Sequence, residues 1–205
     1  MENLPNQFFY SKEEDRLNVI SHGIGFILSI IGLIFLLNKG LQDFNLLRFL
    51  SFLIYGISLS TMYIASTLYH NSKTPEGRYK FRLFDMVSIY LLIAGSYTPF
   101  TLTVLIDSGG LTLFFLVWFI AFIGIIWKIF TVGNYNISST LLYIFMGGLW
   151  LFFIDAFINE IPQNALMWIY ASVSTYLIGV FFYLADSKVK YLSLIHISEP
   201  TRPVM

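Results

Sequence analysis

Six apolar runs, each about 20 residues long, constrain the fold of this chain more than any other feature. They lie near residues 19–38, 45–69, 83–106, 111–130, 138–158 and 165–185. A helix of this length spans the hydrocarbon core of a bilayer. Backbone N–H and C=O groups have no water partners in lipid, so runs without polar-apolar alternation must be helical there. The sequence therefore predicts an all-α, multi-pass transmembrane helix bundle with six spans.

The composition limits the partners and the chemistry. Only 12% of the residues are charged and 57% are hydrophobic, whereas soluble domains carry about 25% charged residues. The formal net charge is zero, which argues against a nucleic-acid partner because such proteins carry a basic face. The chain has no cysteine, so a transition-metal site would have to use imidazole and carboxylate ligands. Membrane lipids are the partners that we expect.

The distribution of basic residues predicts the orientation in the membrane. Cytoplasmic loops are enriched in Lys and Arg. One side of the predicted bundle carries Lys12, Arg16, Lys73, Arg78, Lys80, Arg82, Lys128, Lys188 and Lys190. The other side carries only Lys39 and Arg48. We therefore expect a cytoplasmic N-terminus. The acidic start lacks the basic region of a signal peptide, so the first span should be both the anchor and the topology signal.

Three polar residues stand where the second span ends and the third begins. Ser66 and His70 occur in STLYH, and Asp85 occurs in RLFDM. Ionisable side chains are costly in a membrane and mark functional sites by default. Ser66 and His70 are four residues apart and so share a helix face. With the predicted topology, His70 and Asp85 lie at one depth near the inner leaflet, which predicts a buried polar site and makes a metal ion a candidate ligand.

Each of these residues also has a simpler explanation. His70 can be an interfacial residue that only makes hydrogen bonds, and Ser66 can be a small residue at a helix contact. Asp85 can be a solvated carboxylate near the N-terminal end of a helix, where negative charge is favourable. His22 opens the first span with Asn18 one turn before it. For His22 we expect packing or support of the same site rather than metal ligation.

Three motifs carry a resemblance to a known family. NVISHGIGF in the first span, STLYH at the end of the second and LFDMVSIYLLIAGSYTPF in the third are similar to those of the hemolysin III family. These bacterial proteins belong to the wider superfamily of adiponectin and progestin receptors. The resemblance covers about residues 12–190. It implies a multi-pass protein of the bacterial plasma membrane with seven helices, of which this chain has six, and a zinc ion on the cytoplasmic side.

The resemblance also implies roles for individual residues. In the superfamily, the histidine that ends the second span and two histidines four apart in the seventh span hold the zinc. The first of these ligands corresponds to His70. The family's serine corresponds to Ser66, and its aspartate, which is thought to orient the zinc-bound water, corresponds to Asp85. This chain departs from the family pattern at the next residue, where Met86 replaces the usual histidine.

The end of the chain departs further from the family. Residues 192–202 read LSLIHISEPTR, which resembles the translation of a transposon-adapter sequence used to prepare DNA sequencing libraries. We therefore expect one hemolysin III-like domain over residues 1–191 and a non-native tail over residues 192–205. His196 lies in that tail and is not counted as a ligand. We expect zinc in the intact family member and weak or absent zinc binding in a chain without the seventh span.

Three functions fit this interpretation. The first is hydrolysis of a lipid amide such as ceramide, or a related role in membrane-lipid homeostasis. In it, a zinc-bound water is activated, Asp85 either accepts a hydrogen bond from that water or acts as general base, and Ser66 stabilises the oxyanion. The second is a pore-forming cytolysin, although no span carries the ring of charge or polar stripe that lines a pore. The third is a non-catalytic, receptor-like protein with structural zinc. The sequence does not specify the substrate or the oligomeric state.

Overall fold

The computed structural model describes residues 10–42, 44–131 and 136–186, and the side chains of residues 136–137 and 182–186 are outside this description. The chain forms two compact units, Met1–Ile161 and Pro162–Met205. The second unit is described only through its single helix. The predicted tail over residues 192–205, with His196, lies outside the described residues. The single domain predicted over residues 1–191 stays a prediction.

The described residues are mostly helical and include no strand, which confirms the all-α prediction. The first unit contains α1 (Lys12–Leu41), α2 (Leu46–Asn71), α3 (Pro75–Pro99), α4 (Leu111–Phe130), α5 (Asn136–Gly147) and α6 (Ile154–Glu160). It also contains two π-helices, η2 (Phe100–Val104) and η3 (Ile106–Gly110), and one 3-10 helix, η4 (Leu149–Phe153). The second unit contains α7 (Gln163–Asp186).

Six helical segments of the described chain are long and apolar enough to cross a membrane. They are Lys12–Leu41, Leu46–Asn71, Pro75–Val104, Ile106–Phe130, Ser138–Glu160 and Gln163–Phe181. The six predicted spans are therefore confirmed. Large apolar side chains cover the outer surface of the first unit: Phe35 is 70% exposed and Phe152 is 77% exposed. Such a surface suits lipid rather than water.

Two helices begin well before the apolar runs that predicted them. The capping box of Ser11 and Glu14 starts α1, seven residues before the predicted span. Thr74 caps α3, and Pro75 occupies its first turn, where the missing N–H of proline is harmless. Local hydrogen bonds determine where these helices start, whereas the hydropathy of the sequence reveals only the part of each helix that faces lipid. Asp85 consequently lies inside α3 rather than near its N-terminal end, and the helix-end explanation of this carboxylate does not apply.

The fifth predicted span is interrupted. α5 ends at Gly147, a 3-10 segment follows, and α6 completes the crossing. The hydroxyl of Tyr97 on α3 lies 3.0 Å from the carbonyl oxygen of Met146 and 2.9 Å from that of Gly147. It also accepts a hydrogen bond from the backbone N–H of Trp150 at 3.3 Å. The break is thus stabilised by a side chain from another helix, because backbone groups freed in lipid need partners.

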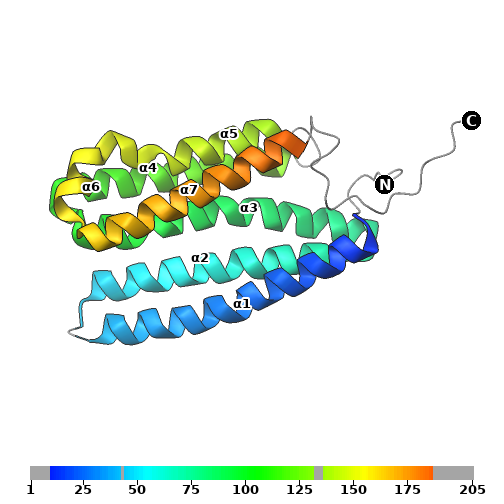
Figure 1. Ribbon diagram of the computed structural model, residues 1–205, viewed down its shortest axis with the longest axis horizontal. Coiled ribbons are helices and arrows are strands. Elements are labelled where there is room, and N and C mark those ends of the chain that lie inside the picture. Colours follow the sequence, from blue (N-terminus) through cyan, green and yellow to red (C-terminus); the bar gives the residue numbers. More distant parts are fainter. Residues whose placement is uncertain (1–9, 43, 132–135, 187–205) are drawn as a thin grey trace, which may run out of the picture. The chain divides into compact units, whose positions relative to one another are not determined.

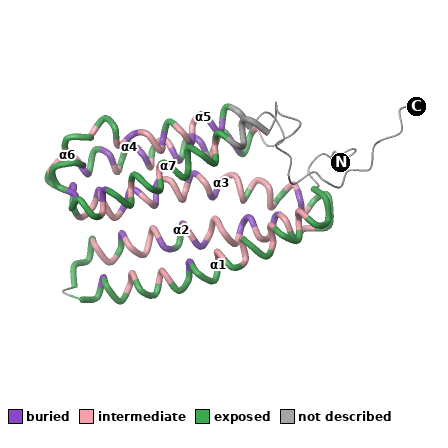
Figure 2. Tube along the Cα trace, viewed as in Figure 1, coloured by how far each residue is buried: buried purple, intermediate pink, exposed green. Residues whose placement is uncertain are grey.

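Helix α2 packs against α1 on one side and α3 on the other, and α3 also packs against α4 and α5. Figure 1 shows α1, α2 and α3 side by side, and Figure 2 shows their buried residues concentrated on α2 and α3. A glycine allows α2 and α3 to approach each other closely. A Cβ at Gly95 on α3 would lie 2.5 Å from the Oγ of Ser58 on α2. The α1 start, the α2 end and the α3 start consequently share one end of the bundle, called here the His70 end.

Candidate functional site

The first polar group at the His70 end joins α2 to α3. Ser66 is 4% exposed, and its side chain lies next to the Asp85 carboxylate and interacts with it. The Ser88 hydroxyl donates to the backbone carbonyl of Asp85 at 2.6 Å. Two residues that the sequence proposed for one site are therefore neighbours on α2 and α3. We call them the Ser66–Asp85 pair.

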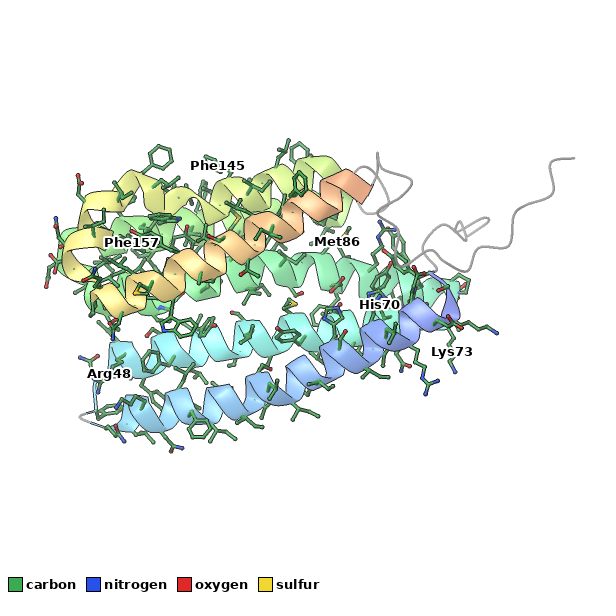
Figure 3. All side chains as sticks on the ribbon, viewed as in Figure 1. Arg48, His70, Lys73, Met86, Phe145 and Phe157 are labelled. Carbon is green, nitrogen blue, oxygen red and sulfur yellow. The ribbon has the colours of Figure 1, made fainter. Side chains whose placement is uncertain are left out.

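The second polar group joins α2 to α1. His70 lies in the last turn of α2, where Figure 3 shows it on the side next to α1. Its Nδ1 is 3.0 Å from Oδ1 of Asp15 and 3.5 Å from Nδ2 of Asn18. Its side chain is only 10% exposed. Asp15 and Asn18 are three residues apart on α1, so both face the end of α2.

Aromatic rings enclose the imidazole of His70. The ring of His22 is stacked on it, with centroids 5.9 Å apart and an interplanar angle of 3°. The ring of Tyr10 lies 5.5 Å away on a tilted plane. His22 continues the α1 face of Asp15 and Asn18, because the three residues follow an i, i+3, i+7 spacing. The stacking is consistent with the supporting role expected for His22.

A buried arginine ties this group together. Arg78 on α3 has no solvent exposure. Its Nη2 donates to both carboxylate oxygens of Asp15, at 2.6 and 2.8 Å. Its Nη1 donates to the backbone carbonyls of Tyr69 at 2.8 Å and His70 at 3.0 Å. One guanidinium thus binds the carboxylate of α1 and two backbone carbonyls in the last turn of α2. Asp15, Asn18, His22, His70 and Arg78 thus form one connected cluster at the His70 end.

Sequence reasoning missed Asp15 and took Arg78 only as a topology signal. The spacing of Asp15, Asn18 and His22 on one helix face was a signal that could have revealed Asp15. No such signal existed for Arg78, because its pairing with Asp15 joins residues 63 positions apart. A buried ion pair of this kind depends on how three helices meet.

The two polar groups are adjacent but separate. In the described chain the hydrogen-bond partners of the His70 side chain are on α1, and the side-chain partner of Asp85 is on α2. One turn of α2, from Ser66 to His70, connects them. The structure therefore brings together Ser66 and Asp85, and it places His70 next to them without a direct bond to Asp85.

The donor groups at the His70 end meet only part of what a zinc ion requires. A ligating histidine usually gives its second ring nitrogen to a carboxylate, as Nδ1 of His70 does with Asp15. Nε2 of His70 thus fits one ligand position. Within residues 10–42, 44–131 and 136–186, however, no group of three or more His, Asp or Glu side chains could hold a metal ion. The described residues do not form a zinc site by themselves.

Comparisons with known proteins agree with the motifs in the sequence. A family profile described as "Haemolysin-III related" matches residues 10–196. Hemolysin-3 of Bacillus cereus is 38% identical over 172 residues, which is 84% of this chain and 78% of that protein. A Hemolysin-3 homolog of Bacillus subtilis (strain 168) is 33% identical over 175 residues, 85% of this chain and 82% of that protein. No solved structure matches significantly.

Proposed function

The chain belongs to the haemolysin-III-related family of multi-pass bacterial membrane proteins, and we propose that it hydrolyses amide-linked membrane lipids at the His70 end. The observation that carries the proposal is the contact between Ser66 and Asp85. Ionisable groups inside a membrane bundle mark functional sites. A carboxylate beside a hydroxyl, one turn from an imidazole, provides the groups that acid-base chemistry on a carbonyl requires.

Asp85 is the general base in this proposal. A water molecule adds to the amide carbonyl carbon while its proton passes to the Asp85 carboxylate. The proton then moves to the amine nitrogen as the C–N bond breaks, which gives a fatty acid and a free amine. The Ser66 hydroxyl lies next to Asp85 and interacts with it, so we assign it to orienting the carboxylate. The oxyanion role expected from sequence would require this hydroxyl to change its partner.

Zinc enters the proposal through one residue. We propose Nε2 of His70 as a single zinc ligand, supported by the carboxylate on Nδ1. The described residues do not complete a metal site, and no step of the proposed reaction is assigned to the metal. We therefore expect this chain to bind zinc weakly. A His70→Ala variant should weaken that binding further in a zinc titration.

We further propose that the His70 end faces the cytoplasm. The basic residues Lys12, Lys73 and Lys80 lie at this end, whereas Lys39 lies at the other, as the positive-inside rule requires. The chain has no cysteine, so single cysteines can report the orientation without background. A cysteine in place of Lys73 should resist a membrane-impermeant maleimide in intact cells, whereas one in place of Gln42 should react.

Lipid turnover tests the catalytic proposal. Purified protein in liposomes that contain ceramide should release fatty acid, measured by mass spectrometry. Asp85→Asn should lower the turnover by about 100-fold or more, the usual contribution of a general base. Asp107→Asn is the matched control, because this exposed carboxylate lies at the opposite end. Full turnover by Asp85→Asn would show that Asp85 is not the base.

Two other functions remain as alternative outcomes. The relatives are named hemolysins, which favours a membrane-permeabilising protein as the second candidate. Dye release from liposomes that is equal for the wild type, Asp85→Asn and His70→Ala would support a pore in place of the hydrolase. Bound zinc without turnover of any lipid amide would indicate a non-catalytic, receptor-like protein.

A further inference from the structure

We infer that Asp15 is a positioning residue that fixes His70 in one tautomer, with the proton on Nδ1 and the lone pair on Nε2. Arg78 in turn holds Asp15. This role goes beyond the proposed function and concerns two residues outside the Ser66–Asp85 pair. It rests on that function in one respect only, namely that Nε2 is the ring nitrogen proposed to bind zinc. The tautomer itself can be measured without metal or lipid.

The hydrogen-bond partners determine where the proton lies. Arg78 has only donors, so both oxygens of Asp15 act as acceptors toward it, at 2.6 and 2.8 Å. The same Oδ1 lies 3.0 Å from Nδ1 of His70. An accepting carboxylate requires a donor at this position, and the proton therefore belongs on Nδ1. The bond made by one ring nitrogen sets the state of the other.

Asn18 provides the competing interaction. Its Nδ2 lies 3.5 Å from Nδ1 of His70 and is a donor, so it would favour the opposite tautomer. That distance is at the limit of a hydrogen bond, whereas the Asp15 contact is short and pairs with a charged acceptor. The carboxylate therefore decides the tautomer.

Arg78 also fixes the position of the histidine itself. Its Nη1 donates to the His70 carbonyl at 3.0 Å, while its Nη2 binds Asp15. One buried guanidinium thus holds the backbone of His70 and, through Asp15, its ring. The ring of His22 covers one face of the His70 ring, with the two centroids 5.9 Å apart. These contacts come from α1, α2 and α3 together, so the direction of Nε2 follows from the way the three helices pack.

Nuclear magnetic resonance of protein labelled with ¹⁵N-histidine tests the inference. The chain has three histidines, and His22→Gln and His196→Gln variants assign the signals. The spectra are recorded on metal-free protein in detergent at pH 8, above the ordinary imidazole pKa of about 6.5. We expect His70 to show a protonated Nδ1 and an unprotonated Nε2. A protonated Nε2 in the wild type would overturn the inference even if no variant folds.

Variants of Asp15 provide the second measurement. In Asp15→Asn the amide oxygen should turn to Arg78 and the NH₂ group to His70, which predicts loss of the Nδ1–H form and gain of the Nε2–H form. Asp15→Glu should retain the Nδ1–H form. Glu13→Gln is the control, because it removes an exposed carboxylate from the same turn. An unchanged His70 tautomer in folded Asp15→Asn protein would overturn the positioning role, whatever the outcome of the lipid assay.

Discussion

Replacing Arg78 with methionine should destabilise the protein strongly, because the change removes a buried cation and leaves its partners behind. The guanidinium has no solvent exposure. It binds both oxygens of Asp15 and the carbonyls of Tyr69 and His70, all within 3.0 Å. Methionine is about as long as the aliphatic stem of arginine and keeps the apolar contacts of that stem. The variant therefore isolates the loss of the charged group.

The contacts of Arg78 give the expected magnitude. Removing one partner of a buried ion pair costs about 3–5 kcal/mol, because the other charge stays buried without compensation. Asp15 keeps 18% exposure of its side chain, so part of its charge can be hydrated again. The two α2 carbonyls lie at a helix end, where water can replace the lost donors. We therefore expect a loss of about 3 kcal/mol in the free energy of unfolding, at the lower end of this range.

Reversible unfolding in mixed detergent micelles, followed by tryptophan fluorescence, measures this loss. The control is Arg16→Met, an exposed arginine on α1, which should change the free energy of unfolding by less than about 0.5 kcal/mol. A loss for Arg78→Met as small as that of the control would refute the view that this guanidinium ties α1, α2 and α3 together.

Two further stability predictions concern helix contacts away from the site. Tyr97→Phe removes the hydroxyl that stabilises the break after α5, and should cost about 1–3 kcal/mol in the same unfolding experiment; a neutral effect would contradict this account of the break. Gly124→Ala places a Cβ against the buried ring of Tyr90 and should cost about 1–3 kcal/mol. In the control Gly23→Ala, the new Cβ meets no atom within 4 Å, so equal losses for both variants would argue against close packing of α4 on α3.

The fold was predictable from sequence because lipid permits few alternatives. Six apolar runs without alternation leave only helices, and the structure has six such segments. The helix starts were predicted less well, since the capping residues Ser11 and Thr74 are polar and lie outside the apolar runs. The break after Gly147 was missed as well. Its stability comes from Tyr97, a residue about 50 positions away.

The candidate site was predictable only in part. Ser66, His70 and Asp85 were proposed because polar residues at span ends are rare, and their common depth followed from the order of the helices, whereas the contact of Ser66 with Asp85 was not predicted. Asp15 and Arg78 were missed as site residues. A charged residue near the start of a predicted span suggests an interface or a topology signal, and only the packing of three helices reveals that these two charges form a buried pair.

The most direct test of the Ser66–Asp85 pair is a double-mutant cycle on ceramide turnover. The wild type, Ser66→Ala, Asp85→Asn and the double variant are compared in the liposome assay. If Ser66 acts by orienting Asp85, its loss should matter only while the carboxylate is present, since residues that act as a unit are not additive. We therefore predict that the double variant is no slower than Asp85→Asn alone. Losses that multiply would show that the two residues act independently and would contradict the account.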